Sequence, residues 1–469
     1  MIDPSWLSLL PPFLAIGLAL ATRQVYLALF AGIWLGYFLL DDVNLLASLA
    51  QAIEASIAVL ASPGDARVVV FTLVVGAFIL TLERSGAVTG LVAWLERARW
   101  VNNGKRAQWL SWCIGVLIFI ESNITVLVAG TVARPLFDRY KIAREKLAYI
   151  IDSTSAPICI LIPLNAWGAF NLGLLDGLGV DDPLQVLLAS IPLNLYAISA
   201  VALAAFTIAR SYNPGPMAEA QARADRGELV GLDVVVDTAV APDKAAALAQ
   251  PRAANMLVPV LTLVLAMPIG LWITGDGDLL AGSGSTAVLW ASLLALVVIS
   301  VMALAQRQTN LEKLSHTWLE GAGRMLPIAV VLVLALALGT VAKALGTGVY
   351  VAGLMGDTIP VALLPAVIFL IAGVIAFSVG SSWGTFSIMM PIAIPIAVAL
   401  GAEPALFVAA VLSGGIFGDH ASPISDTTIV SSLAAGTEHI DHVKTQLPYA
   451  GQAALISTVG FVLLGVLML

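Results

Sequence analysis

Four short polar clusters interrupt a chain that is otherwise almost entirely apolar, and their residue types suit the binding of a small cation. The densest cluster is GDHASPISDTT at 418–428, and the others are ESNIT at 121–125, DSTSAP at 152–157 and GSSWGT at 380–385. Pro157 and Pro423 remove backbone donors, which leaves carbonyl oxygens beside carboxylates and hydroxyls. An all-oxygen shell suits a hard ion such as Na⁺. Because each Asp at the centre of a membrane helix costs about 2.5–3.5 kcal/mol, we expect the clusters to be functional.

We predict two sites for a cation or a proton by pairing the clusters within each half of the chain. The first site comprises Glu121, Ser122, Asn123, Thr125, Asp152, Ser153, Thr154 and Ser155. The second comprises Ser381, Ser382, Thr385, Asp419, His420, Ser422, Ser425, Asp426 and Thr427. We assign Na⁺ itself to Asp419, Ser422, Asp426, Ser381 and Ser382. No cofactor is expected beyond Na⁺ as the coupling ion.

Simpler roles are open for the carboxylates. Asp419 and Asp426 could cap the helix that resumes after the break, and Asp152 could cap a helix of its own. Glu121 could be a buried, protonated hydrogen-bond donor instead of a ligand. Asp426 follows Asp419 by seven residues, so the two would share a face only on a continuous helix.

Simpler roles are also open for the other polar and aromatic residues. Serine and threonine in membrane helices often bond their own backbone, and Asn123 could merely tolerate a turn. His420 could be a satisfied polar residue instead of a proton carrier. His439 and His442 are expected in a solvated cytoplasmic turn. The aromatic residues near the clusters could line a substrate pocket or simply pack: Trp167, Phe170 and Trp383.

Composition identifies a membrane protein without a sizeable soluble domain. The 469 residues are 59% hydrophobic and 11% charged, with a mean hydropathy of +0.97, whereas about a quarter of a soluble chain is charged. No nucleic-acid or phosphate-loop motif is present, and the two cysteines lie in apolar runs. An enzyme is not expected, because Ile416 breaks the Gly-x-Gly-Asp pattern of intramembrane aspartyl proteases and no His-Glu metal motif exists.

Apolar segments of membrane-spanning length recur along the chain. They cover residues 7–22, 24–40, 67–83, 147–174, 184–209, 255–274, 285–305, 325–345, 404–435 and 447–469. Two others, 107–137 and 360–402, are too long for one crossing and have polar centres. We interpret both as re-entrant helical hairpins.

Charge bias supports this interpretation, because positively charged loops stay cytoplasmic. Basic residues flank the first hairpin on both sides: Arg84, Arg97, Arg99, Lys105 and Arg106 before it, and Arg134, Arg139, Lys141, Arg144 and Lys146 after it. The loops that this assignment places outside are acidic or neutral, including Asp41 and Asp42. The N-terminus is then outside.

The sequence predicts two related halves. Residues 1–210 form the first predicted repeat, with the hairpin 107–137 and a broken helix 147–174. Residues 211–254 are predicted to form a polar cytoplasmic linker. Residues 255–469 form the second predicted repeat, with the hairpin 360–402 and a broken helix 404–435. A shift of 260 residues lays Gly86 on Gly346 and ESNIT on SSWGT, and a shift of 266 lays SAPI on ASPI. Five crossings per half invert the second repeat, which is typical of secondary transporters.

The C-terminal motifs FGDHASPISDTTIVSS and EHIDHVKTQLPYA, within 417–449, resemble the NhaC-type Na⁺/H⁺ antiporter family. SNIT at 122–125 is similar to the hairpin tips of the wider ion transporter superfamily. The resemblance covers essentially the whole chain. It implies a multi-pass, cation-coupled transporter of the bacterial cytoplasmic membrane, and it carries over as motif positions Asp419, Ser422, Pro423, Ser425, Asp426 and Thr427. The family also contains members similar to malate–lactate exchangers and Na⁺-coupled amino-acid transporters, and related folds imply a homodimer.

Two functions are therefore expected. The first is Na⁺/H⁺ antiport by alternating access, with carboxylates that bind either Na⁺ or H⁺. The alternative is Na⁺-coupled transport of an amino acid or a small organic acid. Both involve the lipid bilayer and neither involves nucleic acid.

Overall fold

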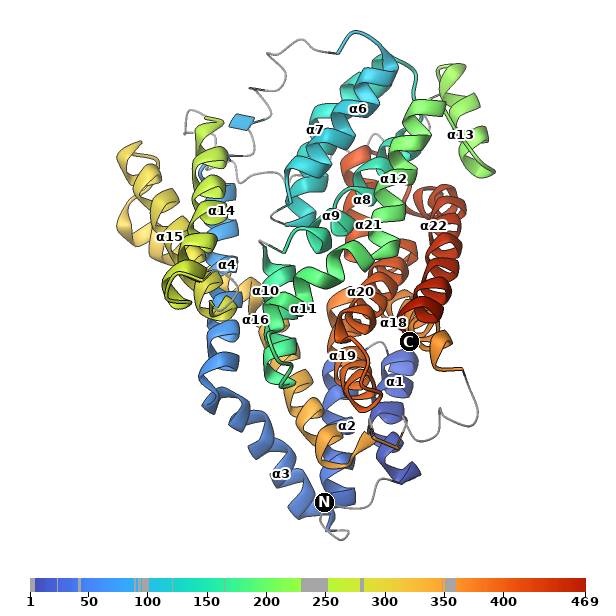
Figure 1. The fold of residues 1–469 in the computed structure, drawn as a ribbon. Helices are drawn as coiled ribbons and strands as arrows, with labels where there is room; N and C mark the ends of the chain where they lie inside the picture. The colour runs from blue at the N-terminus through green and yellow to red at the C-terminus, as the bar shows by residue number, and fades with distance from the viewer. Residues whose placement is uncertain are drawn as a thin grey trace.

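The described part of the protein consists of helices and contains no strand (Figure 1). The structure is a computed structural model that describes residues 5–22, 24–40, 44–87, 90–91, 94, 101–119, 121–163, 165–228, 252–278, 282–347, 349–350 and 360–469. Within these residues, eight helices are long and apolar enough to cross a membrane, or up to ten if two bent pairs each count as one span. This confirms the all-α, polytopic class.

The first half of the chain forms α1 to α13. Their bounds are α1 (Leu10–Thr22), α2 (Val25–Leu40), α3 (Leu45–Ala58), α4 (Pro63–Arg84), α6 (Gly104–Leu117), α7 (Ser122–Arg139), α8 (Arg144–Ser153), α9 (Ala156–Leu161), α10 (Ala166–Gly177), α11 (Pro183–Ser190), α12 (Leu195–Arg210) and α13 (Pro216–Asp225). The bounds of the second half are α14 (Ala254–Thr274), α15 (Gly284–Ala305), α16 (Leu311–Ala344), α18 (Leu364–Val379), α19 (Ser382–Ala399), α20 (Pro404–Ala421), α21 (Asp426–Ala435) and α22 (His439–Met468).

The outer helices expose apolar side chains, as a lipid-facing surface requires. On α14, Leu261, Leu265, Ile269 and Trp272 each expose more than half of their surface. Their spacing of three or four residues places them along one face of the helix. In water so long an apolar stripe would be an association site, whereas in a bilayer it is the solvated face.

Two long helices, α4 and α16, pack closely against each other. A Cβ at Gly321 would lie 2.3 Å from the carbonyl oxygen of Gly76, and a Cβ at Gly76 would lie 2.2 Å from that of Gly321. Small residues let membrane helices approach this closely. α1 and α2 pack together and α2 contacts α16, while α14 and α15 pack together and α15 contacts α4 (Figure 1).

Helix bounds recur in the second half at a constant shift of 260 residues. α7 at 122–139 matches α19 at 382–399, and the segment 144–161 formed by α8 and α9 matches α20 at 404–421. Gly86 and Gly346, 260 residues apart, have φ of 70° and 68°, a left-handed conformation that glycine adopts without strain. These segments of the two halves therefore have the same lengths and follow one another in the same order.

This constant shift corrects one feature of the predicted repeats. Pro163 and Asn165 fall on Pro423 and Ser425, so the break at 162–165 is the counterpart of the break at 422–425. The second interruption of the first half, at 154–155, has no counterpart, because α20 is continuous there. The match of SAPI with ASPI at a shift of 266 is therefore not structural. The two segments resemble each other at that offset because each has serine and alanine directly before a Pro-Ile pair.

The remaining predicted segments are only partly described. Each predicted hairpin contains two helices, α6 with α7 and α18 with α19. The linker 211–254 begins with α13, whose Arg223 pairs with Glu145 of α8 at 2.6 Å, and its residues 229–251 lie outside the described residues. Arg97, Arg99, Asp41 and Asp42 lie outside them as well. α13 and the N-terminus lie at opposite ends of the molecule (Figure 1).

The close packing of α4 and α16 predicts a position-specific loss of stability. Gly321→Ala should lower the unfolding temperature in detergent, because its methyl group overlaps the backbone of α4 and overpacking costs about 1–3 kcal/mol. Gly323→Ala on the same helix is the control, since nothing lies within 4 Å of its Cβ position. An unfolding temperature for Gly321→Ala equal to that of the control would show that the two helices do not meet there.

Candidate cation site

Asp419 is a buried carboxylate that accepts hydrogen bonds from two serine hydroxyls, one at the tip of the second hairpin and one at a helix break. It lies in the last turn of α20 and is 2% exposed. The Ser382 hydroxyl, in the first turn of α19, donates to Oδ2 at 2.7 Å. The Ser425 hydroxyl, at the N-cap of α21, donates to Oδ1 at 2.5 Å. Three helix ends therefore meet at one carboxylate.

The shell extends over further oxygen atoms. The hydroxyls of Ser425 and Thr427 lie 3.0 Å apart, and both side chains are buried. Ser425, not Asp419, caps α21, because its side chain accepts from the Thr427 N–H. Asp419 is therefore not a helix cap, and its burial needs another explanation. Carboxylate and hydroxyl oxygens are the donors that a hard monovalent cation takes.

The other residues predicted for this site bond to backbone. The Ser422 hydroxyl donates to the Phe377 carbonyl at 2.7 Å and fastens the break to α18. Ser381 caps α19, and the Thr385 hydroxyl donates to the Ser381 carbonyl at 2.9 Å. Asp426 is exposed at the start of α21 and accepts from the Thr427 N–H at 2.9 Å. The structure thus brings Ser382, Ser425 and Thr427 to Asp419 and directs the others elsewhere.

At the tip of the first hairpin, the carboxylate of Glu121 accepts hydrogen bonds from groups of the tip itself. Glu121 caps α7, with Oε2 accepting from the Ile124 N–H at 2.7 Å. Its Oε1 accepts from the Asn123 amide at 3.2 Å and lies 3.3 Å from the Ser122 hydroxyl. The Thr125 hydroxyl donates to the Glu121 carbonyl at 2.8 Å. These four predicted residues lie together, and the carboxyl of Glu121 acts as an acceptor here.

Asn165 is a site residue that the sequence prediction does not include. It caps α10 through the Trp167 and Gly168 N–H groups, at 2.9 and 3.1 Å. Its amide nitrogen lies 2.8 Å from the carbonyl oxygens of Phe119, Cys159 and Ile162. Asn165 therefore ties the first hairpin tip to the first break, as Ser425 and Asp419 do in the second half. The 260-residue shift between the halves indicates this residue, because it places Asn165 on Ser425.

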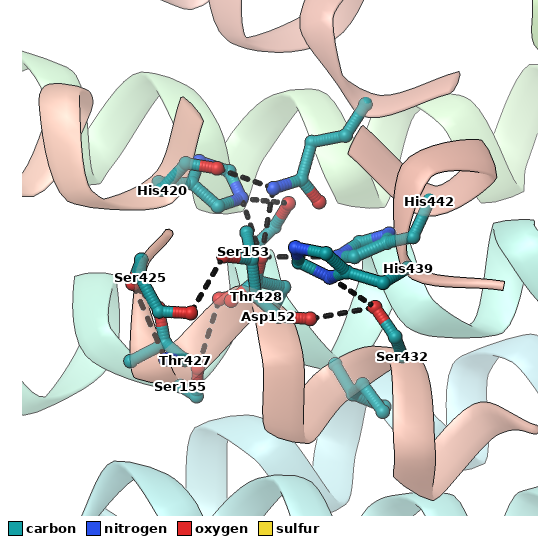
Figure 2. A network of polar contacts seen from close by, with 12 residues as sticks. Asp152, Ser153, Ser155, His420, Ser425, Thr427, Thr428, Ser432, His439 and His442 are labelled. Carbon is teal, nitrogen blue, oxygen red and sulfur yellow. Dashed lines mark hydrogen bonds and ion pairs between the residues drawn. The ribbon is translucent and has the colours of Figure 1, made fainter. Parts of the chain in front are cut away.

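Asp152 does not meet the first hairpin tip in the predicted way. Its Oδ2 lies 3.3 Å from His442 Nε2 and accepts from the Gln446 amide at 2.7 Å, so its hydrogen-bond partners among the described residues come from α22 (Figure 2). Ser153 Oγ lies 3.2 Å from His420 Nε2. Thr154 and Ser155 donate to carbonyls of α8, at 2.8 and 2.9 Å. The four residues 152–155 thus separate from the Glu121 cluster.

The prediction of a solvated turn at His439 and His442 is wrong for His442. His442 is completely buried beside Asp152, and His439 is half-buried, with Nε2 2.6 Å from the Pro423 carbonyl oxygen and Nδ1 3.1 Å from Ser432 Oγ (Figure 2). The charged neighbours in EHIDHVK mask this packing in the sequence, because they occupy the opposite face of the first turns of α22. The histidines face inward.

Aromatic side chains of α10 pack against the tip of the second hairpin. The rings of Trp167 and Trp383 lie 4.8 Å apart, and those of Phe170 and Trp383 lie 4.9 Å apart. Trp167 and Phe170 belong to α10 and are buried. The three residues join α10 to the tip of α19 by packing.

The family is decided by a match to the model of the Na⁺/H⁺ antiporter family, which covers residues 173–466. The chain belongs to the Na⁺/H⁺ antiporter family. The predicted NhaC-type resemblance is thereby confirmed, and the chain is also 32% identical over 96 residues to the Na⁺/H⁺ antiporter NhaC of Alkalihalophilus pseudofirmus, a match that covers 20% of this chain and 21% of that protein.

Other relatives extend this comparison. An uncharacterized protein of Haemophilus influenzae is 31% identical, over 98% of this chain and 90% of its own length. The malate-2H⁺/Na⁺-lactate antiporter of Bacillus subtilis is 32% identical over 20% of both chains. The crystal structure of the YdaH transporter of Alcanivorax borkumensis superposes with a TM-score of 0.58 at 16% identity, covering 97% of this chain and 98% of that one. The protein is therefore a multi-pass secondary transporter and not an enzyme.

The Asp419 shell predicts weaker cation binding when a hydroxyl is removed. Ser382→Ala and Ser425→Ala should each lower the affinity for radioactive Na⁺ by about tenfold or more, because a hydrogen bond to a charged group contributes about 1.5–3 kcal/mol. Ser387→Ala is the matched control on α19, since its hydroxyl donates only to the Trp383 carbonyl, at 2.9 Å. Equal Na⁺ affinity in all three variants would place the cation elsewhere.

Proposed function

We propose that the protein exchanges Na⁺ for H⁺ across the bacterial cytoplasmic membrane by alternating access. The observation that carries this proposal is the buried carboxylate of Asp419, which accepts hydrogen bonds from Ser382 and Ser425 at a helix break. An ionised carboxylate without a counter-charge is strongly disfavoured at membrane depth. The shell is therefore stable when it contains either Na⁺ or a proton, and the two compete for one charge.

Competition at one carboxylate produces exchange only if the empty, ionised site does not change sides. The same desolvation cost that disfavours the empty state disfavours its movement across the membrane. With Na⁺ bound, the carboxylate and the hydroxyls of Ser382, Ser425 and Thr427 supply oxygen donors. With a proton bound, Asp419 becomes a neutral acid, and its own O–H can donate to a serine oxygen.

Alternating access is supported by the repeated architecture. The helix bounds recur at a shift of 260 residues. α4 packs against α16, and each of them also contacts the first helical pair of the other half, because α4 contacts α15 and α16 contacts α2. We propose that the halves are inverted repeats, with breaks at 162–165 and 422–425 as the discontinuous helices that transporters place at the binding site. Exchange of the two halves' conformations would then turn the site from one face to the other.

The charge of one cavity also favours a cation as cargo. A cavity of about 370 Å³ between α4, α10, α11 and α15 is lined by Asp65, Asp176 and Asp182, with Arg67 as its one basic residue. A cavity with net negative walls raises the local concentration of cations. The cavity provides no cluster of cationic side chains for a dicarboxylate.

Na⁺-coupled transport of a small organic solute is the second candidate. The similarity to a protein named as a malate-2H⁺/Na⁺-lactate antiporter favours it, because Na⁺ and organic anions share that protein's name. The aromatic residues Trp167, Phe170 and Trp383 would then border the solute, next to the tip that carries Ser382.

One experiment separates the two functions. Purified protein in liposomes containing a pH dye should respond to external Na⁺ with an alkaline shift inside, with the membrane potential clamped and no organic solute present. Asp419→Ala should abolish the shift, because it removes the charge for which Na⁺ and H⁺ compete. Glu403→Gln, at the exposed start of the same helix, should retain it.

The alternative has its own signature in the same vesicles. If Na⁺ causes no pH change in the unmodified protein, Na⁺/H⁺ exchange is wrong. Uptake of amino acids and small organic acids driven by a Na⁺ gradient, again lost in Asp419→Ala, would then establish solute coupling. Full exchange activity in Asp419→Ala would instead refute the site.

A further inference from the structure

A second buried ionisable pair, Asp152 with His442, lies outside the Asp419 shell. It forms where the end of α8 meets the second turn of α22 (Figure 2). Both side chains are completely buried, and His442 Nε2 lies 3.3 Å from Asp152 Oδ2. The Gln446 amide, one turn further along α22, donates to the same carboxylate oxygen at 2.7 Å.

Each member of this pair has a polar atom without a hydrogen-bond partner in the described part of the chain. These atoms are Oδ1 of Asp152 and Nδ1 of His442. A buried polar atom without a partner costs about 1–3 kcal/mol, and more when the group is charged. A purely structural ion pair would be expected to have its lone pairs and protons satisfied. Two such atoms on one pair leave positions at which a proton can be gained or lost.

The neighbouring histidine is arranged differently. His420 Nδ1 lies 2.8 Å from the Tyr196 hydroxyl and Nε2 lies 3.2 Å from the Ser153 hydroxyl. Both ring nitrogens therefore have partners in its neutral form. His420 Nε2 is 3.9 Å from Asp152 Oδ2, beyond a hydrogen bond. The proton that the carboxylate shares is thus shared with His442.

The pair is close to solvent along α22. His442 follows His439, the first residue of the helix, by one turn, and His439 is half-buried. Glu438 and Lys444 on the outer face of these turns are exposed. The pair therefore lies within two helical turns of exposed charged residues on the same helix.

Other ionisable groups surround the pair without bonding to it. From the elements packed around it these are Tyr149 of α8, Tyr196 of α12, Asp419 and His420 of α20, Asp426 of α21, and His439, Asp441 and Tyr449 of α22. Gln446 connects the pair to the cation site, because its amide also donates to the His420 carbonyl at 2.5 Å. His420 directly follows Asp419. A change at the pair is therefore transmitted to the backbone that holds the cation-binding carboxylate.

We propose that Asp152 and His442 form a second proton-binding site, separate from the Asp419 shell, which sets the pH range over which the transporter works. In the protonated state His442 is an imidazolium whose Nε2–H donates to ionised Asp152, and its second proton is on Nδ1. Release of the Nδ1 proton leaves neutral His442, whose Nε2–H still donates to the carboxylate. The effect on transport rests on the proposed exchange function, whereas binding of the proton does not.

The first test observes the proton directly. The chain has only four histidines, so nitrogen-15 histidine labelling of the protein in liposomes gives few imidazole signals to resolve. His442, identified by its loss in His442→Gln, should change from neutral to imidazolium as the pH is lowered. In Asp152→Asn, which keeps all four histidines, it should stay neutral over the same range because the carboxylate that stabilises its charge is gone.

Two outcomes of this experiment overturn the proposal. One is a His442 signal that stays neutral at every pH in the unmodified protein. The other is a titration of His442 that is the same in Asp152→Asn. His316, exposed on α16, is the internal reference and should titrate identically in both proteins. This test holds even if the protein does not exchange Na⁺ for H⁺.

The second test follows transport across a pH series. His442→Gln and Asp152→Asn should move the half-maximal pH of Na⁺-driven transport by about one unit or more, a tenfold change in proton concentration. His316→Gln, at an exposed residue of α16, is the control and should leave the half-maximal pH in place. An unmoved pH profile in both His442→Gln and Asp152→Asn would refute the proposal.

Discussion

The hydrogen bonds of Ser382 and Ser425 to one buried carboxylate are the interaction on which the arrangement of the second half depends. Ser382 belongs to the hairpin helix α19 and Asp419 to α20, and Ser425 is the N-cap of α21. An interrupted helix exposes backbone groups that the bilayer cannot hydrogen-bond, so irregular backbone is stable there only inside protein or beside a cavity. The carboxylate gives the three helix ends a common partner. The break, the hairpin tip and the charge therefore stabilise one another.

The first half also joins a hairpin tip to a helix break, but its carboxylate is at a different position. Cys159 stands where the second half has Asp419, and Glu121 stands where it has Ser381. Asn165 replaces Ser425 and bridges tip and break through the carbonyls of Phe119, Cys159 and Ile162. The tip residue supplies the carboxylate in the first half and the break residue supplies it in the second. Two halves of the same construction thus carry different chemistry, and only the second places a carboxylate between helices that both end at it.

Sequence patterns predict the elements of this fold better than the partners of its polar side chains. Hydropathy indicates the hairpins and most helices, and Ser-Pro with neighbouring aspartates marks the break that holds Asp419. The contacts of Asp152 with His442 and Gln446 join positions about 290 residues apart, and no local period reports such a contact. His442 was misplaced for a related reason, since a helix longer than the bilayer carries charged and buried faces in the same turns. Asn165 was missed because an asparagine amide replaces a hydroxyl and a carboxylate, so the equivalent residues share no chemical type.

The two polar centres are connected through the last turn of α20. Asp419 and His420 are adjacent, yet Asp419 bonds to α19 and α21, whereas His420 bonds to α8 and α12. Successive residues on a helix point in directions about 100° apart, so one short segment presents two faces to two different sets of helices. The side-chain amide of Gln446 donates a hydrogen bond to the His420 carbonyl in the same segment and another to Asp152. A packed segment of this kind moves as a unit. A displacement of this segment would therefore change the surroundings of Asp419 and of Asp152 together, so the end of α20 connects the two proposed binding sites.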